Sequence, residues 1–163
     1  MSEQPPAQTP PQFHDDVAAE AVKIALAEAA SGVFENNNDN RGPRVDEYQM
    51  VGGMLGEMCC AKFAYWCFQQ AAFKLNTDNP FPRLFGSARL EKWGEDHDRL
   101  FDTPQRGHVF VKAKKHVGIV TGPALDNGTF PSVEGNTYAG AVRRDGVYTL
   151  NKTLIRICRF IRL

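Results

Sequence analysis

The sequence predicts an α+β domain in which helices pack on one face of an antiparallel sheet. Helical periodicity dominates the first half of the 163-residue chain, and short β-branched runs separated by turn residues follow from about residue 108. Helices that precede the strands, rather than alternating with them, are typical of the α+β class. The length is sufficient for one domain with a hydrophobic core of its own.

The first residues differ in composition from the rest of the chain. Residues 1–12 are rich in Pro and Gln and predict a disordered leader, which a single domain over residues 13–163 follows. The leader lacks the basic and apolar regions of a secretory signal, so we expect synthesis in the cytoplasm, where thiols stay reduced.

Composition argues against two classes of partner. No apolar run is long enough to span a bilayer. The 19 basic and 19 acidic residues cancel, whereas nucleic-acid-binding proteins usually carry a basic surplus. We therefore expect neither a membrane nor a nucleic-acid partner, and we expect a monomer.

Helices are expected at three places in the first half. The first covers residues 13–32, where Asp15 or Asp16 caps the start and Gly32 ends the helix. A short helix over residues 45–53 stops at a glycine pair, and a longer one runs from about residue 59 to 75. The longer helix has apolar residues on most of its faces, so we expect it to be largely buried.

The second half predicts strands. The strand-like runs are residues 108–113, 116–122, 129–137, 141–150 and 154–162. The Asp126–Gly128 turn joins the second run to the third. Within the fourth run we expect a hairpin with Asp145–Gly146 at its tip.

Three of the four cysteines lie in "GEMCCAKFAYWCF", residues 56–68. Free cysteine is most often a small buried side chain, and Cys67, two turns into the predicted helix, is expected to be one. Cys59 and Cys60 lie at the helix N-terminus, where unpaired N–H groups and the helix dipole favour a thiolate. No CxxC spacing indicates a zinc site, and we expect no metal or other cofactor. The pattern leaves open whether Cys59, Cys60 or neither is a nucleophile.

A cysteine nucleophile needs a base, and the base needs a partner that orients it. Among the four histidines, His116 has the most suitable surroundings, because a hairpin centred near the 126–128 turn sets it opposite residues 134–138. Glu134 and Asn136 are two residues apart and would share one face of a strand, flanking the imidazole. "EGN" is also an ordinary turn sequence, so this grouping is a hypothesis.

Six segments then occur in a specific order: "NRGPRVDEY", "CCAKFAYWCFQQA", "NPFPRLFGSA", "GHVFV", "HVGIVTG" and "VEGNTYAG". Over about residues 30–163 they resemble the CHAP family, the cysteine- and histidine-dependent amidohydrolases/peptidases of the papain-like/NlpC-like superfamily. The resemblance implies a papain-like fold with Cys60 as nucleophile and His116 as general base. It also implies that Glu134 and Asn136 orient the base.

The chain departs from the family pattern at two positions. Cys59 stands where the family often has tryptophan, which leaves the register of the nucleophile open. His108 stands where relatives usually carry an acidic residue, and we interpret it as surface variation, with a role near the cleft as the minor alternative.

In function, the resemblance implies metal-free hydrolysis of an amide in peptidoglycan peptides, in the periplasm or cell wall after export without a classical signal. Tyr48, which precedes the nucleophile, is a candidate to line the substrate cleft, and a core or rim position is an equal alternative. Two other functions stay open. The chain could be an inactive binding module with the same fold, or a cysteine amidase with a substrate outside the wall.

Overall fold

The computed structural model describes residues 12–57, 60–112, 115–137, 144–153 and 158–163. The predicted leader lies almost entirely outside these ranges, as does Cys59. Four helices and a six-stranded antiparallel sheet make up the described parts of the chain, which confirms the α+β class. None of these helices is both long and apolar enough to cross a membrane.

The helices are α1 (Asp15–Ala30), α2 (Pro43–Met50), α3 (Cys60–Leu75) and α4 (Ser87–Asp96). The predicted cap of α1 is wrong by one or two residues: His14 is the N-cap, and both aspartates lie in the first turn, where their charge favours the helix dipole. The second helix begins two residues earlier than expected because Pro43 occupies its first turn, a position that needs no N–H donor.

The strands are β1 (Leu100–Phe101), β2 (Val109–Lys112), β3 (His116–Val120), β4 (Thr129–Thr137), β5 (Gly146–Thr153) and β6 (Cys158–Ile161), in the spatial order β1-β6-β2-β3-β4-β5. The hairpin tip predicted at Asp145–Gly146 is wrong. Gly146 begins β5 and pairs with Thr137 of β4. A glycine stands here because the backbone of Val33 approaches closely: a Cβ at position 146 would lie 2.3 Å from the Val33 carbonyl oxygen.

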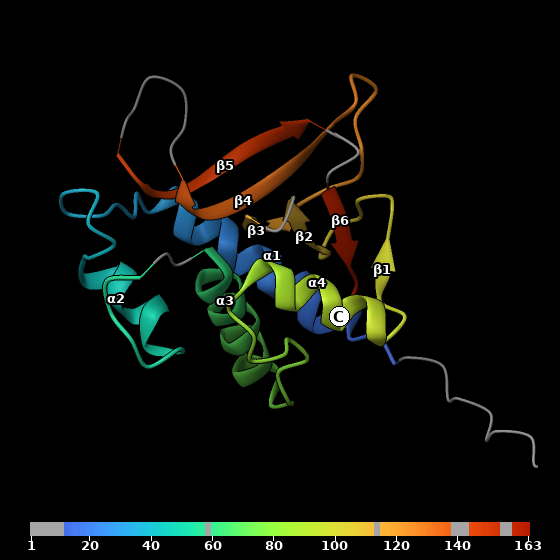
Figure 1. Cartoon of the computed structure of the whole chain (residues 1–163), viewed down its shortest axis with the longest axis horizontal. Helices are drawn as coiled ribbons and strands as arrows, with labels where there is room; N and C mark the ends of the chain where they lie inside the picture. Colours follow the sequence, from blue (N-terminus) through green and yellow to red (C-terminus); the bar gives the residue numbers. More distant parts are fainter. Residues whose placement is uncertain (1–11, 58–59, 113–114, 138–143, 154–157) are drawn as a thin grey trace, which may run out of the picture.

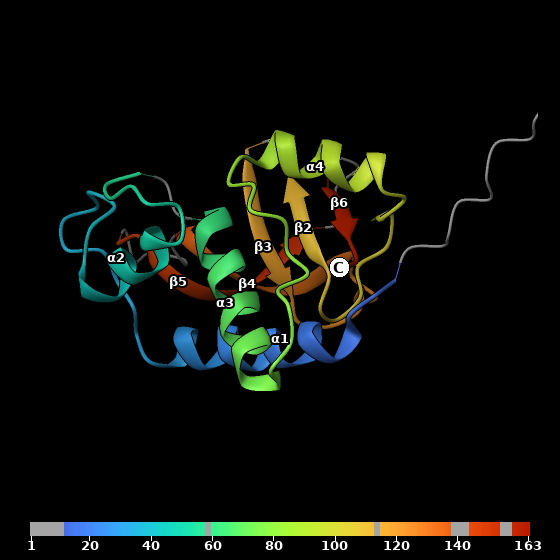
Figure 2. The same cartoon turned by 90° about the horizontal axis from the view of Figure 1, so that it is seen from below.

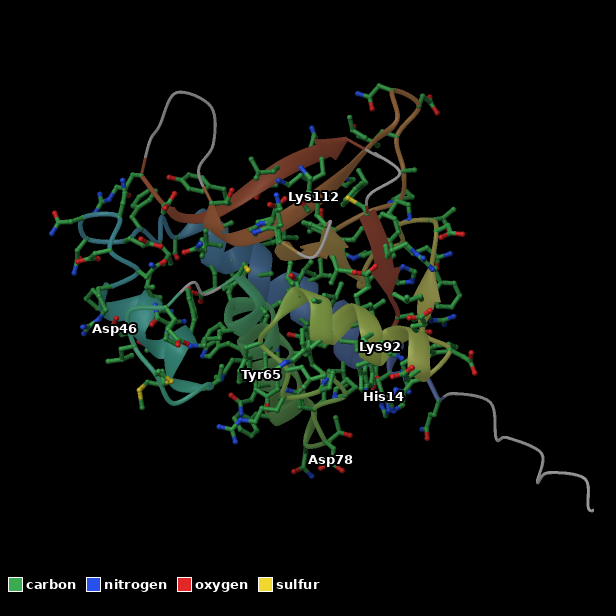
Figure 3. The ribbon with its side chains drawn as sticks, in the orientation of Figure 1. His14, Asp46, Tyr65, Asp78, Lys92 and Lys112 are labelled. Atoms are coloured by element: carbon green, nitrogen blue, oxygen red, sulfur yellow. The ribbon has the colours of Figure 1, made fainter. Side chains whose placement is uncertain are left out.

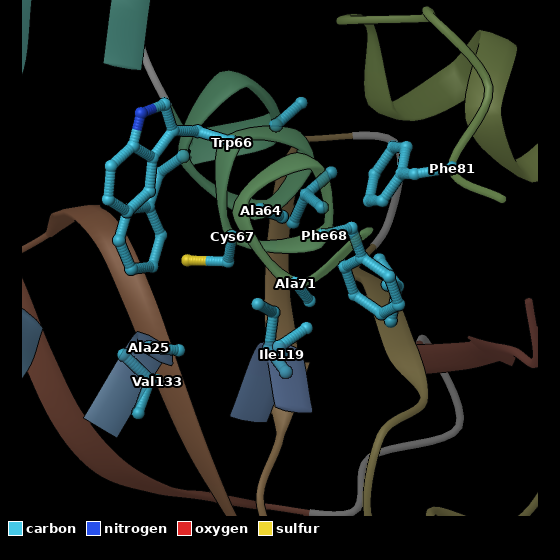
Figure 4. Close-up of a cluster of buried hydrophobic side chains, with 14 of the residues drawn as sticks. Ala25, Ala64, Trp66, Cys67, Phe68, Ala71, Phe81, Ile119 and Val133 are labelled. Atoms are coloured by element: carbon cyan, nitrogen blue, oxygen red, sulfur yellow. The ribbon is translucent and has the colours of Figure 1, made fainter. Parts of the chain in front are cut away.

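The main core lies between the helices and one face of the sheet. The helices α1, α3 and α4 all gather on this side (Figure 1), and the view from below shows α3 crossing α1 (Figure 2). Cys67 of α3 points into this core beside Ala25, Ile119 and Val133 (Figure 4), and its side chain is fully buried. Cys67 is therefore a core residue, as its position in the helix predicts.

The opposite face of the sheet carries a second apolar cluster, which is made largely of aromatic side chains. Phe110, Phe130 and Phe160 pack edge to face, with ring centroids 5.4 Å apart for the first two and 5.2 Å for the last two. Along β3, Val120 belongs to this face and Ile119 to the main core, as the alternation of a strand requires. His116 lies on the same face as Val120, and its ring centroid is 6.1 Å from that of Phe110.

A close contact between α3 and β4 sets the position of the helix on the sheet. Gly135 lies directly against Phe63, and a Cβ at position 135 would be 2.8 Å from the Phe63 Cβ. Only glycine allows this approach without displacing one of the two elements. As a result the N-terminal end of α3 lies beside the beginning of β3, where His116 stands.

Candidate active site

The first residue of α3, Cys60, is the centre of a polar cluster in an otherwise apolar region. Its sulfur is hydrogen-bonded to the side chain of His116, and backbone N–H groups of Val117 and Ala61 also interact with it. Cys60 thus lies at a helix N-terminus, and its partners are two amide donors and an imidazole. This position and these partners stabilise a thiolate.

Glu134 lies on the other side of the imidazole. The Nε2 atom of His116 is 2.8 Å from Oε2 of Glu134. Because Nε2 is taken by the carboxylate, Nδ1 is the ring nitrogen left for the sulfur of Cys60. The structure thus brings Cys60, His116 and Glu134 into one hydrogen-bonded chain, in which Glu134 holds the orientation of the ring.

The Glu134 carboxylate is fully buried and is held by three groups. Besides His116, the ammonium of Lys152 lies 2.9 Å from Oε2, and the hydroxyl of Ser132 donates to Oε1 over 2.7 Å. A buried carboxylate is tolerated only when it is paired and hydrogen-bonded, and these contacts meet that requirement. Ser132 and Lys152 are therefore part of the site, although no sequence pattern indicated them.

Gly118 makes room for this arrangement. A Cβ at position 118 would lie 2.5 Å from the ring of Phe110 and 2.8 Å from Cγ of Glu134. The side chain of Glu134 occupies the space that any larger residue at position 118 would need. The glycine of the "HVGIV" segment is thus a requirement of the His116–Glu134 contact.

The electrostatics of the three groups favour the charged pair. Burial alone would raise the pKa of the Cys60 thiol, but the hydrogen bond and the charge of His116, with the two backbone donors, hold that pKa below its ordinary value. Burial alone would lower the pKa of His116, but its contacts with Cys60 and Glu134 raise it to about 9. Burial opposes the ionisation of Glu134 too, and His116, Ser132 and Lys152 nevertheless keep its pKa below the usual value. These shifts favour the thiolate of Cys60 beside the imidazolium of His116.

Asn136 takes a different position from the one expected. The pairing of β4 with β5 is irregular between Glu134 and Thr137, and Asn136 lies in this bulge with φ of 54°. The bulge breaks the strand alternation that would place both side chains against His116, so the prediction that they flank the imidazole is met by Glu134 alone. Asn136 lines a cavity next to His116, and its buried Oδ1 atom has no hydrogen-bond partner among the described residues.

Tyr48 is not a substrate-binding residue. Its side chain is fully buried, packs edge to face against Phe63 and Trp66, and donates its hydroxyl to Glu28. Burial and the neighbouring Glu28 carboxylate raise its pKa well above the ordinary value. The proposed role in a cleft is therefore wrong, and the core alternative holds.

The other three histidines have no contact with Cys60 among the described residues. His14 occupies the N-cap position of α1 without a side-chain capping hydrogen bond, and His97 is exposed at the end of α4, where Nδ1 is 2.7 Å from the Trp93 carbonyl oxygen. His108 is buried against Phe101, so the interpretation as surface variation is wrong. Burial is also the main cause that lowers the pKa of His108 to about 4.

Comparison with family models, curated proteins and solved structures found no match to this chain. The CHAP resemblance and the papain-like fold therefore stay predictions, and the site rests on its own geometry. In the described parts of the chain, no group of three or more His, Cys, Asp or Glu side chains is arranged to hold a metal ion.

The lowered pKa of Cys60 predicts that this thiol is alkylated faster at neutral pH than an ordinary thiol. The rate of its reaction with iodoacetamide should rise at a lower pH than that of an ordinary cysteine, and it should fall as the thiolate takes up a proton. Mass spectrometry of the labelled peptide across pH 4–10 would measure this profile. The internal controls are Cys67 and Cys158, because burial raises the pKa of both thiols. A Cys60 rate that rises only around pH 9, as for an ordinary thiol, would contradict the assignment.

Proposed function

We propose that this chain is a CHAP-like, papain-fold cysteine hydrolase that cleaves an amide bond in peptidoglycan peptides. The observation that carries the proposal is the hydrogen-bonded chain from Cys60 through His116 to the buried carboxylate of Glu134. A nucleophile, a base and a group that orients the base are sufficient for covalent acyl transfer. The choice of peptidoglycan rests on the family resemblance.

In the first half of the reaction the Cys60 thiolate attacks the carbonyl carbon of the amide, and a C–S bond forms. His116 then gives its proton to the amide nitrogen, the C–N bond breaks and the amine leaves. This step needs a protonated imidazole, which the pKa of about 9 supplies at neutral pH. The product on the enzyme is a thioester at Cys60.

In the second half water replaces the amine. His116, now neutral, takes a proton from water as the water oxygen attacks the thioester carbonyl. The C–S bond breaks, the carboxylic acid leaves, and the thiolate and imidazolium are restored. Throughout, Glu134 holds Nε2 of His116, so that the other ring nitrogen faces the reacting atoms.

The negative oxygen of the tetrahedral intermediate needs donors. The backbone N–H of Cys60 is the donor that we propose, because the first N–H groups of a helix have no intrahelical acceptor. One such donor contributes roughly 3 kcal/mol to transition-state stabilisation in comparable sites.

The decisive experiment is release of muropeptides from purified sacculi of several wall types, followed by mass spectrometry, with the Cys60→Ser variant as the blank. We expect fragments that differ by hydrolysis of one amide, with no effect of chelators. In this proposal the enzyme acts in the periplasm or wall, where the substrate lies. No fragment from any wall type, despite fast alkylation of Cys60, would reject peptidoglycan and favour an amidase with another substrate. Slow alkylation together with no release would favour the inactive binding module.

A further inference from the structure

A cavity of about 380 Å³ opens beside His116. The described residues that line it are Lys112, Lys115, His116, Asn136, Thr137, Asp145 and Lys152. Three of the seven are lysines, against a single carboxylate. Ammonium groups therefore outnumber carboxylates in its lining, although most of the surface of its walls is apolar.

Two of the lysines have no counter-ion in the described structure. Lys152 is paired with Glu134, whereas no ion pair of Lys112 or Lys115 occurs among the described residues. Lys112 is the direct cross-strand partner of His116, so the two side chains project from the same face of the sheet. Figure 3 labels Lys112 in the region of the sheet, away from the exposed Lys92 of α4. The positive charge is therefore concentrated next to the base.

Asn136 also belongs to the lining, and its Oδ1 atom is buried with no hydrogen-bond partner among the described residues. The left-handed backbone conformation at Asn136 holds the side chain at this place in the bulge. Because this oxygen is buried, it is not offered to a ligand in the cavity. The unpaired ammonium groups are the groups that suit a ligand, and the ligand they suit presents a carboxylate.

The chemistry of the site decides which half of the substrate enters the cavity. His116 must protonate the amide nitrogen as the C–N bond breaks, so the nitrogen and the group attached to it lie on the imidazole side of the sulfur. The cavity is lined by His116, and Cys60 does not belong to its lining. The amine half of the substrate is therefore the half that meets Lys112 and Lys115.

We infer that this cavity selects amides whose amine half carries a free carboxylate, bound by Lys112 and Lys115. The inference rests on the proposed function and specifies its substrate: a peptide or amino-acid leaving group with an acidic, unamidated residue next to the cleaved bond. Each charge-assisted hydrogen bond of this kind is about twice as strong as a neutral one.

The first test needs no turnover. Iodoacetate and iodoacetamide have the same size and differ in charge, so the ratio of their rates with Cys60 reports the positive field around the sulfur. The Lys112→Gln/Lys115→Gln double variant should lower the ratio of the iodoacetate rate to the iodoacetamide rate about fivefold or more. This is the order of magnitude that Coulomb's law gives for removal of two positive charges near the sulfur. Lys92→Gln, which removes an exposed lysine of α4, is the matched control and should leave the ratio unchanged. An unchanged ratio in the double variant would overturn the inference.

The second test uses pairs of purified muropeptides that carry either a carboxylate or a carboxamide on the amine side of the cleaved bond. We expect kcat/KM about tenfold higher for the carboxylate, and loss of this preference in the double variant but not in Lys92→Gln. Equal cleavage of both members of a pair would overturn the inference and leave the proposed function intact. Cleavage of neither, with fast alkylation of Cys60, would contradict the proposed function, and the alkylation ratio would then decide the inference.

Discussion

Replacement of Cys60 by serine is expected to abolish turnover, with a loss of at least about 10⁴-fold in kcat, because residues that act as one catalytic unit lose nearly the whole rate when one is removed. The contacts with His116 and two backbone donors lower the pKa of the sulfur at this position and favour the thiolate, whereas a serine hydroxyl would stay protonated. The measurement is muropeptide release together with iodoacetamide labelling, and both signals should disappear.

Cys67→Ser is the matched control, because it makes the same atomic change about two turns further along the same face of α3. Its side chain is fully buried in the main core, so the new hydroxyl costs about 1–3 kcal/mol of unfolding free energy, measurable in urea, while activity is kept. Cys59→Ser should also keep most activity. If Cys59→Ser is inactive and Cys60→Ser is active, the assignment of the nucleophile is wrong.

Glu134→Gln should lower kcat by up to about 10⁴-fold without preventing labelling of Cys60, as loss of the orienting carboxylate does in Ser-His-Asp triads. The amide cannot supply the negative charge that His116 and Lys152 share, so the pKa of His116 falls from about 9 towards its ordinary value. The thiolate then loses part of its counter-ion, and the alkylation profile of Cys60 should move to higher pH.

Ser132→Ala is the matched control for Glu134. It removes the hydrogen bond to Oε1 and leaves the 2.8 Å contact between Oε2 and His116 in place. We expect a loss of about one to two orders of magnitude at most, and a smaller shift of the profile in the same direction, since one hydrogen bond to a charged group is worth about 1.5–3 kcal/mol. An alkylation profile that is unchanged in Glu134→Gln would show that Glu134 does not act on the base.

Elements with a local signal could be predicted from the sequence, and elements that depend on distant pairing could not. The three first helices follow from apolar periodicity and glycine stops. The fourth helix, α4, was missed because only Leu90 and Gly94 are buried. Most of its other residues are charged or exposed, so the sequence has only a weak apolar periodicity there. The two-residue strand β1 exists through its pairing with β6, about sixty residues later in the chain.

The candidate site shows the same division. Cys60 could be chosen because it lies at the start of a predicted helix. His116 could be chosen because the predicted hairpin places it opposite residues 134–138. The structure brings the two side chains together. Lys152 was missed because its contact with Glu134 requires the pairing of β4 with β5, which the misplaced hairpin tip concealed. Asn136 was misplaced because a bulge cannot be recognised from a three-residue turn-like sequence.

The contact between Gly135 and Phe63 makes thiol reactivity a property of the completed fold. The helix can bring Cys60 to His116 only while it lies against β4 at the distance that a missing Cβ allows. In a nascent or partly unfolded chain the sulfur has neither its imidazole nor its backbone donors, and it is an ordinary, weakly nucleophilic thiol. The reactive thiolate therefore forms only after the tertiary structure is complete. In any variant, the rate of Cys60 labelling reports whether α3 is packed against β4 as in the native fold.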